Sequence, residues 1–469
     1  MVPTAEHHDL VIIGGGPAGY ATALYGASAG LDVAIIEKNK YGGTCLHVGC
    51  IPAKELLETA AVYRHVSHAK DFGINVSEPG LDFGVTQDRK QGIIDKLSGG
   101  LVSMMKGRKI TVLEGTGSLT GPGQVKVTGG QSGDVELTAD SILLAAGSVP
   151  RTIPGFEVDG TTVVTSDELL ALRELPSSAI VIGGGAIGCE FASMMSDLGT
   201  QVTILEALPK ILPGCDTDVA NIVVRSFKKR GIDIRTGVKV NGHTPRDGGG
   251  TTVHLEGGDD IEVETVVVSV GRRPYADELG LDNAGVASDD RGFVQVGETC
   301  RTSVDGIWAA GDLIATPQLA HVGFAEGMVV VKDILGENPL PVDYGKVPWA
   351  IYCHPEVAFA GYSEDAAKEA GYDVVTSKHR YAPNGRAMIV GETDGLVKVI
   401  AEKRPDGTGG QVLGVHMVGP WVTEQLGQGY LAVNWEATVD EIAQFIQPHP
   451  TMSEVFGETV IALTGRSLH

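Results

Sequence analysis

Two cysteines lie close together in the stretch GGTCLHVGCIPAK, which runs from Gly42 to Lys54. Four residues separate Cys45 from Cys50, so the chain must turn between them for the sulfur atoms to meet, and Gly49 supplies backbone freedom for that turn. Pro52 suits the first turn of a helix, which places Cys50 at a helix N-terminus that stabilises a thiolate. An accessible disulfide of this kind is easily reduced, so the spacing predicts a redox-active pair.

Two other interpretations of the pair are reduced cysteines without a function and half of a zinc site. Zinc sites usually have a second closely spaced ligand pair such as C-x2-C, which this sequence lacks, so we predict no metal. The other cysteines are widely spaced, and we expect them to be buried small side chains. They are Cys189, Cys215, Cys300 and Cys353.

A histidine near the other end of the chain has the properties of a general base. His449 lies between Pro448 and Pro450, which restrict the backbone and can aim the imidazole, and thiol deprotonation requires a base of this kind. Glu454 would orient and polarise the ring. The alternative is a T-x-x-E capping box formed by Thr451 and Glu454, with His449 an ordinary loop residue. The two roles can coexist.

These residues need elements to position them, and the N-terminus supplies the first. The segment DLVIIGGGPAG runs from an apolar strand through glycines into a helix, and a second strand ends at Glu37. Gly14, Gly16 and Gly19 fit G-x-G-x-x-G, which gives a tight turn, close approach of a pyrophosphate and close packing of helix on strand. Glu37 lies where a carboxylate accepts hydrogen bonds from ribose hydroxyls. This pattern predicts a nucleotide site.

The same pattern recurs in the middle of the chain. Gly183, Gly185 and Gly188 follow a second apolar strand, and Glu206 ends the next one. Two strand-flanked copies, each closed by a glutamate, predict two nucleotide sites. Glu206 would repel a 2′-phosphate and the following ALPKILP contains no arginine, so we predict that the second site prefers NAD to NADP.

The rest of the chain gives coarser signals. A long helix is expected over about residues 84–109, and the strand GIWAAGD ends at Asp312, which suits a ligand hydroxyl or an ordinary turn. After the proline-rich ENPLPVDYGKVP, alternating segments predict an antiparallel sheet followed by helices.

The composition limits the possible partners. Lys and Arg number 36 against 59 for Asp and Glu, so the net charge of −23 argues against nucleic acid or an anionic membrane as a partner. This acidity serves solubility, or it forms a patch that docks a basic partner. No secretory or transit signal and no apolar run of about 20 residues is visible, so we expect a cytoplasmic protein.

The cysteine stretch, the two fingerprints, GIWAAGD and the terminal HPTMSE together resemble the flavoprotein disulfide reductases, and within them the members that oxidise dihydrolipoyl groups. The resemblance spans essentially the whole chain. Two departures are small: Tyr41 stands where leucine is common before GGTC, and AAGS from Ala145 to Ser148 replaces ATGS. Neither touches the chemistry directly.

The resemblance implies an α/β fold with two Rossmann-like dinucleotide-binding domains and a C-terminal α+β dimerisation domain. We expect a FAD-binding domain at 1–150, an NAD-binding domain at 151–274, a central domain completing the FAD site at 275–345 and an interface domain at 346–469. The implied enzyme is an NAD-dependent oxidoreductase that oxidises protein-bound dihydrolipoyl groups, with electrons passing through a disulfide and FAD to NAD⁺.

The resemblance also implies roles for residues. Cys45 exchanges with substrate, Cys50 contacts the flavin, and His449 with Glu454 acts across a homodimer. Segments matching the FAD site contain Gly14, Gly16, Gly19, Glu37, Thr44, Lys54, Gly117, Ala145, Gly147, Asp312 and Ala320. Those matching the NAD site contain Gly183, Gly185, Gly188, Glu206 and Gly271. Lys54 and Glu190 resemble an ion pair near the flavin, although each alone also reads as a surface charge.

The expected partner is a lipoyl-bearing acyltransferase of a 2-oxo acid dehydrogenase complex, or the glycine cleavage carrier. Reductases of glutathione, trypanothione or mercuric ion share the architecture. The first two need arginines after the second fingerprint and the third a terminal cysteine pair, and this sequence has neither. A non-catalytic flavin-binding subunit is a further alternative, disfavoured because the thiols and His449 occur together.

Overall fold

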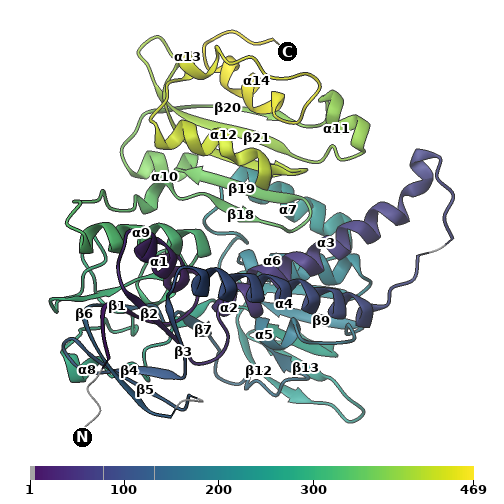
Figure 1. Cartoon of the computed structure of the whole chain (residues 1–469). Helices are drawn as coiled ribbons and strands as arrows, with labels where there is room; N and C mark the ends of the chain where they lie inside the picture. The colour runs from purple at the N-terminus through teal and green to yellow at the C-terminus, as the bar shows by residue number, and fades with distance from the viewer. Residues whose placement is uncertain (1–5, 78, 131–132, 469) are drawn as a thin grey trace, which may run out of the picture.

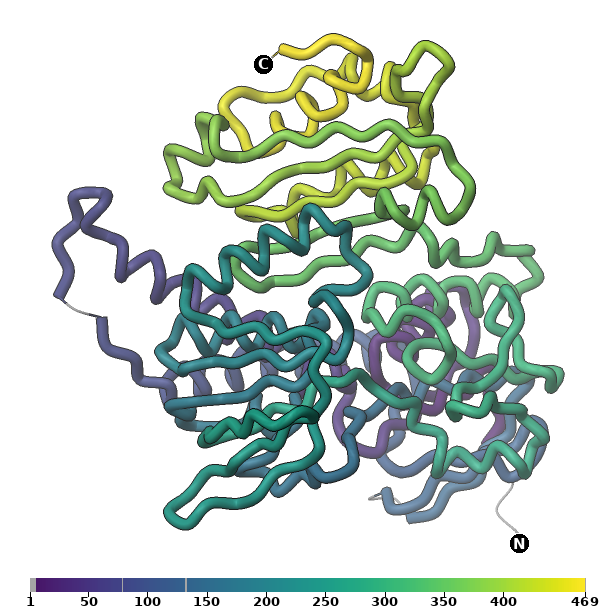
Figure 2. Tube along the Cα trace, turned by 180° about the vertical axis from the view of Figure 1, so that it is seen from behind, coloured from purple at the N-terminus to yellow at the C-terminus, as the bar shows by residue number. Residues whose placement is uncertain are grey.

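The computed structural model of the chain describes residues 6–77, 79–130 and 133–468. Two α/β units lie beside one another, and the C-terminal segment is stacked above both of them (Figure 1). The view from behind shows the same arrangement, with the yellow-green C-terminal sheet resting on both units (Figure 2).

The first unit is built on a seven-stranded sheet with the order β3-β2-β1-β6-β5-β4, and β17 pairs with β6. The four strands β3, β2, β1 and β6 are parallel, as is β17 on β6, whereas β4 and β5 form an antiparallel extension. The strands are β1 (Glu6–Ile13), β2 (Val33–Glu37), β3 (Thr111–Glu114), β4 (Thr116–Gly121), β5 (Gln124–Thr128), β6 (Val135–Leu144) and β17 (Ile307–Ala309).

The central strands of this sheet are apolar and buried toward their carboxyl ends, where β1 ends in LVII and β6 in ILL. Leu10, Val11 and Ile12 of β1 are fully buried. The helices α1 (Pro17–Ser28) and α9 (Ala320–Ile334) pack against each other, although about 300 residues separate them. The long helix expected near 84–109 is confirmed as α4 (Phe83–Gly107), whose first turn is capped by the side chain of Asp82.

The second unit contains an entirely parallel sheet with the order β11-β10-β9-β15-β8. Its strands are β8 (Val163–Val164), β9 (Ser178–Ile182), β10 (Gln201–Glu206), β11 (Asp233–Thr236) and β15 (Thr265–Val268). An antiparallel meander of β12 (Val240–Pro245), β13 (Thr251–Leu255) and β14 (Asp260–Val263) follows. The main helices are α5 (Ser166–Leu169), α6 (Ala186–Asp197) and α7 (Thr217–Lys229).

The C-terminal segment forms an antiparallel sheet with the order β18-β19-β22-β21-β20. Its strands are β18 (Trp349–Ile351), β19 (Glu356–Gly361), β20 (Val374–Arg380), β21 (Leu396–Lys403) and β22 (Gly409–Gly419). Its helices are α10 (Glu364–Glu369), α11 (Gly385–Val390), α12 (Val422–Asn434), α13 (Val439–Ile442) and α14 (Glu454–Ala462).

This arrangement confirms the predicted fold class, with two parallel α/β units and a C-terminal α+β unit. The domain boundaries stay predictions, although β17 and α9 do join the first unit. None of the helices in the described ranges combines the length and apolar character that a bilayer crossing needs.

Candidate active site

The cysteine pair lies at the junction of two helices. Cys45 belongs to the short α2 (Gly43–His47), and Cys50 is the first residue of the 18-residue α3 (Cys50–Ser67), as its spacing from Pro52 predicts. Between them, a Cβ on Gly49 would lie 2.9 Å from the Thr44 carbonyl oxygen, so close packing requires glycine. The turn needs no left-handed backbone, since φ of Gly49 is −149°.

Both side chains are thiols in this structure, and they are hydrogen-bonded to each other. The pKa of Cys50 falls to about 7 because Cys45 donates this hydrogen bond and because Lys54 is nearby. The same bond, together with burial, raises the pKa of Cys45. The pair is therefore asymmetric: Cys50 ionises easily, whereas Cys45 keeps its proton until a base removes it.

An ion pair lies beside the thiols. Lys54 Nζ is 2.9 Å from both carboxylate oxygens of Glu190 on α6, and the Tyr352 N–H donates to Glu190 Oε1 at 2.9 Å. Burial alone would lower the pKa of Lys54, but the interaction with Glu190 outweighs it and raises that pKa. The two residues are thus partners rather than separate surface charges. They join α3 to the second unit and, through the Tyr352 N–H, to the C-terminal unit.

The first fingerprint has the geometry of a nucleotide turn. Gly14 has φ +114°, and a Cβ there would lie 2.2 Å from the Ala145 carbonyl oxygen. A Cβ on Gly19 would lie 1.9 Å from Gly14 O, so the helix packs directly on the turn. Glu37 accepts a hydrogen bond from the Gly15 N–H at 2.7 Å. The predicted site residues of this βαβ unit therefore converge.

The helix bearing Cys45 lies directly against this turn. The Gly42 N–H donates to Gly15 O at 2.8 Å, and a Cβ on Gly43 would lie 2.6 Å from Gly16 Cα. Thr44 lies in the same helix. The fold thereby brings the thiol pair and the first fingerprint together.

The second fingerprint repeats the turn. Gly183 has φ +108°, and a Cβ on Gly188 would lie 1.9 Å from Gly183 O. Glu206 Oε2 accepts from the Gly184 N–H at 2.6 Å, as Glu37 does in the first unit. A Cβ on Gly185 would meet nothing within 4 Å. The second turn is therefore open at Gly185, although the Leu212 N–H donates to Gly184 O at 2.8 Å on its other side.

The other predicted ligand residues lie around the carboxyl ends of the parallel strands. Gly147 and Gly271 have positive φ, and a Cβ on either would meet nothing within 4 Å, whereas Gly117 packs closely on Ile13 and Ile36. Ala145 follows β6, and Ala320 is the first residue of α9.

Asp312 lies in the short helix η2 (Gly311–Leu313) after β17, and its Oδ2 accepts from Ser148 Oγ at 2.6 Å. A purely local turn role does not account for this long-range contact.

A residue that the sequence analysis missed fixes the Asp312 loop. Glu326 on α9 is fully buried and accepts hydrogen bonds from the Gly311 N–H at 2.6 Å, Thr316 Oγ1 at 2.8 Å and the Tyr344 hydroxyl at 3.0 Å. Burial raises its pKa despite these donors. A glutamate within the apolar run QLAHVGFAEGMVVV was the available signal, since an acid there must find buried partners.

His449 is oriented as predicted but stands apart from the thiols. Its Nδ1 is 2.8 Å from Glu454 Oε1, and its side chain is 79% exposed. Within the described part of the chain, no hydrogen bond or ion pair joins His449 to either cysteine. The histidine belongs to the C-terminal segment, and α2 belongs to the first unit (Figure 1).

The capping box at Thr451 is only half formed. The Thr451 N–H donates to Glu454 Oε2 at 2.8 Å, but the threonine hydroxyl donates to Pro448 O instead of capping a helix. The helix α14 begins at Glu454 itself, after Ser453. The capping alternative is therefore wrong in its threonine half, while the glutamate holds both His449 and the loop.

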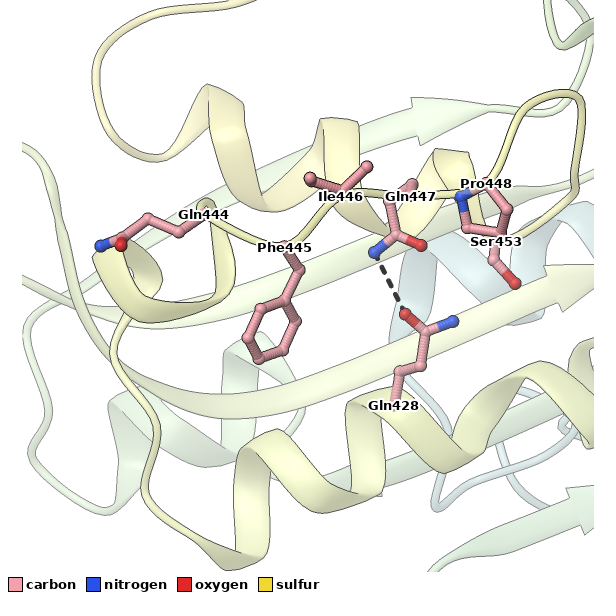
Figure 3. Close-up of a pocket in the computed structure, with 7 residues that line it drawn as sticks. All are labelled: Gln428, Gln444, Phe445, Ile446, Gln447, Pro448 and Ser453. Atoms are coloured by element: carbon pink, nitrogen blue, oxygen red, sulfur yellow. Dashed lines mark hydrogen bonds between the residues drawn. The ribbon is translucent and has the colours of Figure 1, made fainter.

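An open hollow of about 600 Å³ flanks the His449 loop (Figure 3). Gln447 Nε2 donates to Gln428 Oε1 at 3.2 Å across it. Ile446 is 97% exposed and Phe445 63% exposed, so a single chain leaves large apolar side chains uncovered here.

Comparison with known proteins gives consistent matches over the whole chain. Residues 8–327 match the family described as pyridine nucleotide-disulphide oxidoreductase, and residues 347–460 match its dimerisation domain. A dihydrolipoyl dehydrogenase of Bacillus subtilis is 41% identical, with 99% of this chain and 100% of the relative covered. One from Thermus scotoductus is 38% identical, with 98% of each covered.

Solved structures agree with this similarity. The crystal structure of LpdA from Mycobacterium tuberculosis has a TM-score of 0.91 at 26% identity, covering 98% of this chain and 100% of that one. The Cu(II) complex of the HOCl-induced flavoprotein disulfide reductase RclA from Escherichia coli has a TM-score of 0.87 at 28% identity, covering 98% and 100%.

Proposed function

The chain belongs to the pyridine nucleotide-disulphide oxidoreductase family, and from this premise we propose that it acts as a dihydrolipoyl dehydrogenase. It oxidises protein-bound dihydrolipoyl groups and passes two electrons through Cys45 and Cys50, by way of FAD, to NAD⁺. The observation that carries this proposal is the asymmetric thiol pair. Cys50 begins α3, and α2, which bears Cys45, packs against the first nucleotide turn.

The first unit fits FAD and the second NAD. In both turns a Cβ on the first or the third glycine would collide with backbone, as the tight turn of a dinucleotide site requires, and each unit has a carboxylate at the end of its second strand. Glu206 and the absence of a following arginine favour NAD. FAD, when bound beside the thiols, would supply the two-electron carrier between them and NAD⁺.

The residues of this chain carry the thiol chemistry. The oxidised enzyme has a Cys45–Cys50 disulfide. A base, which we assign to the partner subunit's His449, takes a proton from one substrate thiol, and the resulting thiolate attacks Cys45 Sγ. The disulfide breaks, a mixed disulfide forms at Cys45, and Cys50 leaves as a thiolate. The second substrate sulfur then closes the lipoyl ring, and its proton ends on Cys45.

The environment of the two thiols suits these roles. A leaving thiol of low pKa departs more readily, and Cys50 has a pKa of about 7. Cys45 holds its proton more tightly, so the reverse reaction needs a base at this sulfur. Lys54 stabilises the Cys50 thiolate electrostatically, while Glu190 fixes the position of the lysine.

The base must come from a second copy of the chain in this proposal. His449 is exposed and, among the described residues, has no hydrogen bond or ion pair to the thiols of its own chain, and it lies in the part that matches a dimerisation domain. The exposed apolar side chains of Phe445 and Ile446 at the open hollow beside it suit burial in a two-fold interface.

The physiological partner is a lipoyl-bearing acyltransferase of a 2-oxo acid dehydrogenase complex or the glycine cleavage carrier. The net charge of −23 favours a carrier or subunit that docks through basic residues.

A substrate comparison tests the proposal. The purified protein should reduce NAD⁺ with dihydrolipoamide far faster than it reduces glutathione disulfide with NADPH. The reverse preference would assign the site to another reductase of this family. Absence of both activities in protein that retains FAD would favour a non-catalytic role.

A further inference from the structure

Two short strands carry the chain between the first and second units. The chain leaves the first unit through β7 (Ser148–Pro150) and returns through β16 (Arg272–Pro274), and the two strands pair antiparallel. Arg272 follows Gly271, a residue of the predicted NAD site. It therefore lies at the crossing between the two nucleotide sites.

The Arg272 side chain makes two hydrogen bonds to Ser148. Its Nε donates to Ser148 Oγ at 2.7 Å, and its Nη2 donates to Ser148 O at 2.8 Å. Ser148 Oγ lies 2.6 Å from Asp312 Oδ2, and the guanidinium Nε lies 3.8 Å from that same oxygen. Ser148 is buried, and the arginine side chain is only 11% exposed.

The direction of each hydrogen bond follows from the chemistry of the groups. A guanidinium only donates and a carboxylate only accepts, so the single Ser148 hydroxyl proton must point to Asp312. The arginine occupies an acceptor position of that hydroxyl and prevents it from turning away. The position of Asp312 Oδ2 is thereby fixed. Within the described residues, no hydrogen bond of the chain uses Oδ1 of Asp312.

We propose that Arg272 is a positioning residue for FAD binding: acting through Ser148, it holds Asp312 so that the free carboxylate oxygen meets a hydroxyl of the cofactor. This inference rests on the proposed function, which places FAD in the first unit. The competing role is a structural one, in which Arg272 only ties β16 to β7.

The chain provides a matched control for the test. Arg273 is the next residue, its side chain is 48% exposed, and its ion pair is the surface contact with Asp277 at 3.4 Å. The test compares R272Q with R273Q: FAD-free protein is titrated with FAD, and the flavin fluorescence is followed. R272Q should bind FAD about tenfold to a hundredfold more weakly, the range for losing hydrogen bonds to a charged group. R273Q should match the unsubstituted protein.

Further variants separate positioning from a structural role. S148A should weaken FAD binding similarly, and R272Q/S148A should add little to either single loss because the residues act in one relay. R272K should recover only part of the affinity, since lysine retains the charge without the two-pronged geometry. The Tm of the FAD-free protein and the Kd for NAD⁺ should stay unchanged in all these variants.

Unchanged FAD affinity in R272Q would overturn the proposal, as would a lowered Tm of the FAD-free protein with parallel losses for FAD and NAD⁺. If R272Q does not fold, S148A decides by the same criteria. Normal FAD affinity in R272Q, in protein that oxidises dihydrolipoamide, defeats this inference alone. Protein that binds FAD with the expected dependence on Arg272 but lacks that activity defeats the proposed function alone.

Discussion

The two nucleotide units have nearly the same fingerprint geometry but different surroundings. Gly14 and Gly183 have φ values of +114° and +108°, and each unit closes with a glutamate bound to a backbone N–H of the turn. In the first unit α2 packs on the turn, with Gly43 against Gly16, whereas Gly185 of the second faces open space. The motif thus fixes the turn, and distant segments decide whether a ligand is enclosed.

This difference suits the two proposed ligands. A cofactor that stays bound through the cycle benefits from the cover that α2 and η2 provide, and these same elements bring Cys45 and Asp312 to it. A co-substrate that must leave after each turnover benefits from an open turn. The following predictions test this division, from the largest expected effect to the smallest.

Cys45→Ser should abolish the chemistry of the first unit while sparing the second. Dihydrolipoamide oxidation should fall by at least about 10³-fold because the attacked sulfur is gone. Electron transfer from NADH to an artificial dye should persist, since it needs only the flavin and the nicotinamide site. The buried Cys215→Ala serves as the control. Equal loss of both activities in Cys45→Ser would contradict the separation of the two sites.

His449→Gln should slow the dithiol half-reaction by about 10²- to 10⁴-fold, the usual contribution of a general base. The NADH-to-dye reaction should change little. Rapid-mixing measurements of the two half-reactions separate these effects. Equal slowing of both would argue against a role at the thiols.

A hybrid dimer tests which chain supplies the base. One C45S chain paired with one H449Q chain should retain one working site of two, because the H449Q chain keeps its thiols and receives the histidine of the other. Activity near half of the unsubstituted dimer supports donation across the interface. An inactive hybrid, with both parent homodimers inactive, would place the base within its own chain.

Alanine at Gly43 and at Gly185 should affect different ligands. Gly43 has φ +57°, and an added Cβ would lie 2.6 Å from Gly16 Cα, so Gly43→Ala should displace α2 and weaken FAD retention by about tenfold or more. Gly185→Ala has space for its methyl group and should keep FAD, with only the KM for NAD⁺ raised. Titration of FAD and steady-state kinetics measure the two effects. Loss of FAD from both variants would show that the turns are not independent.

The pH dependence of Cys50 should reflect its environment. Its pKa is lowered to about 7 by the hydrogen bond from Cys45 and by Lys54, so the thiolate predominates above that pH and is protonated below it. Alkylation of the reduced protein at Cys50 should rise as pH increases through about 7. Lys54→Gln should move this rise to higher pH, because the positive charge that favours the thiolate is lost.

The other cysteines provide an internal control for this titration. Burial raises the pKa of Cys189, Cys215, Cys300 and Cys353, so they should not react in the same range. Peptide mapping identifies the alkylated residue. If Lys54→Gln does not shift the pH dependence of Cys50 alkylation, Lys54 does not lower the pKa of Cys50.

The sequence by itself determined the features that depend on near neighbours. The glycine turns, the glutamates that close them, Cys50 at the start of α3 and the helix α4 all follow from local backbone preferences and from the periodicity of apolar residues. The tertiary structure decided the contacts between residues far apart in the chain. Examples are the ion pair of Lys54 with Glu190, the packing of Gly43 against Gly16, the hydrogen bond from the Gly311 N–H to Glu326, and the Arg272–Ser148–Asp312 relay.

The half-formed capping box shows why the two differ. Thr451 and Glu454 have the spacing of a cap, yet the threonine hydroxyl binds Pro448 and the glutamate also holds His449. A short motif specifies which bonds are available, and the packing of the whole chain selects among them. Tertiary packing makes the difference because it sets which partners lie within hydrogen-bonding reach of each polar group.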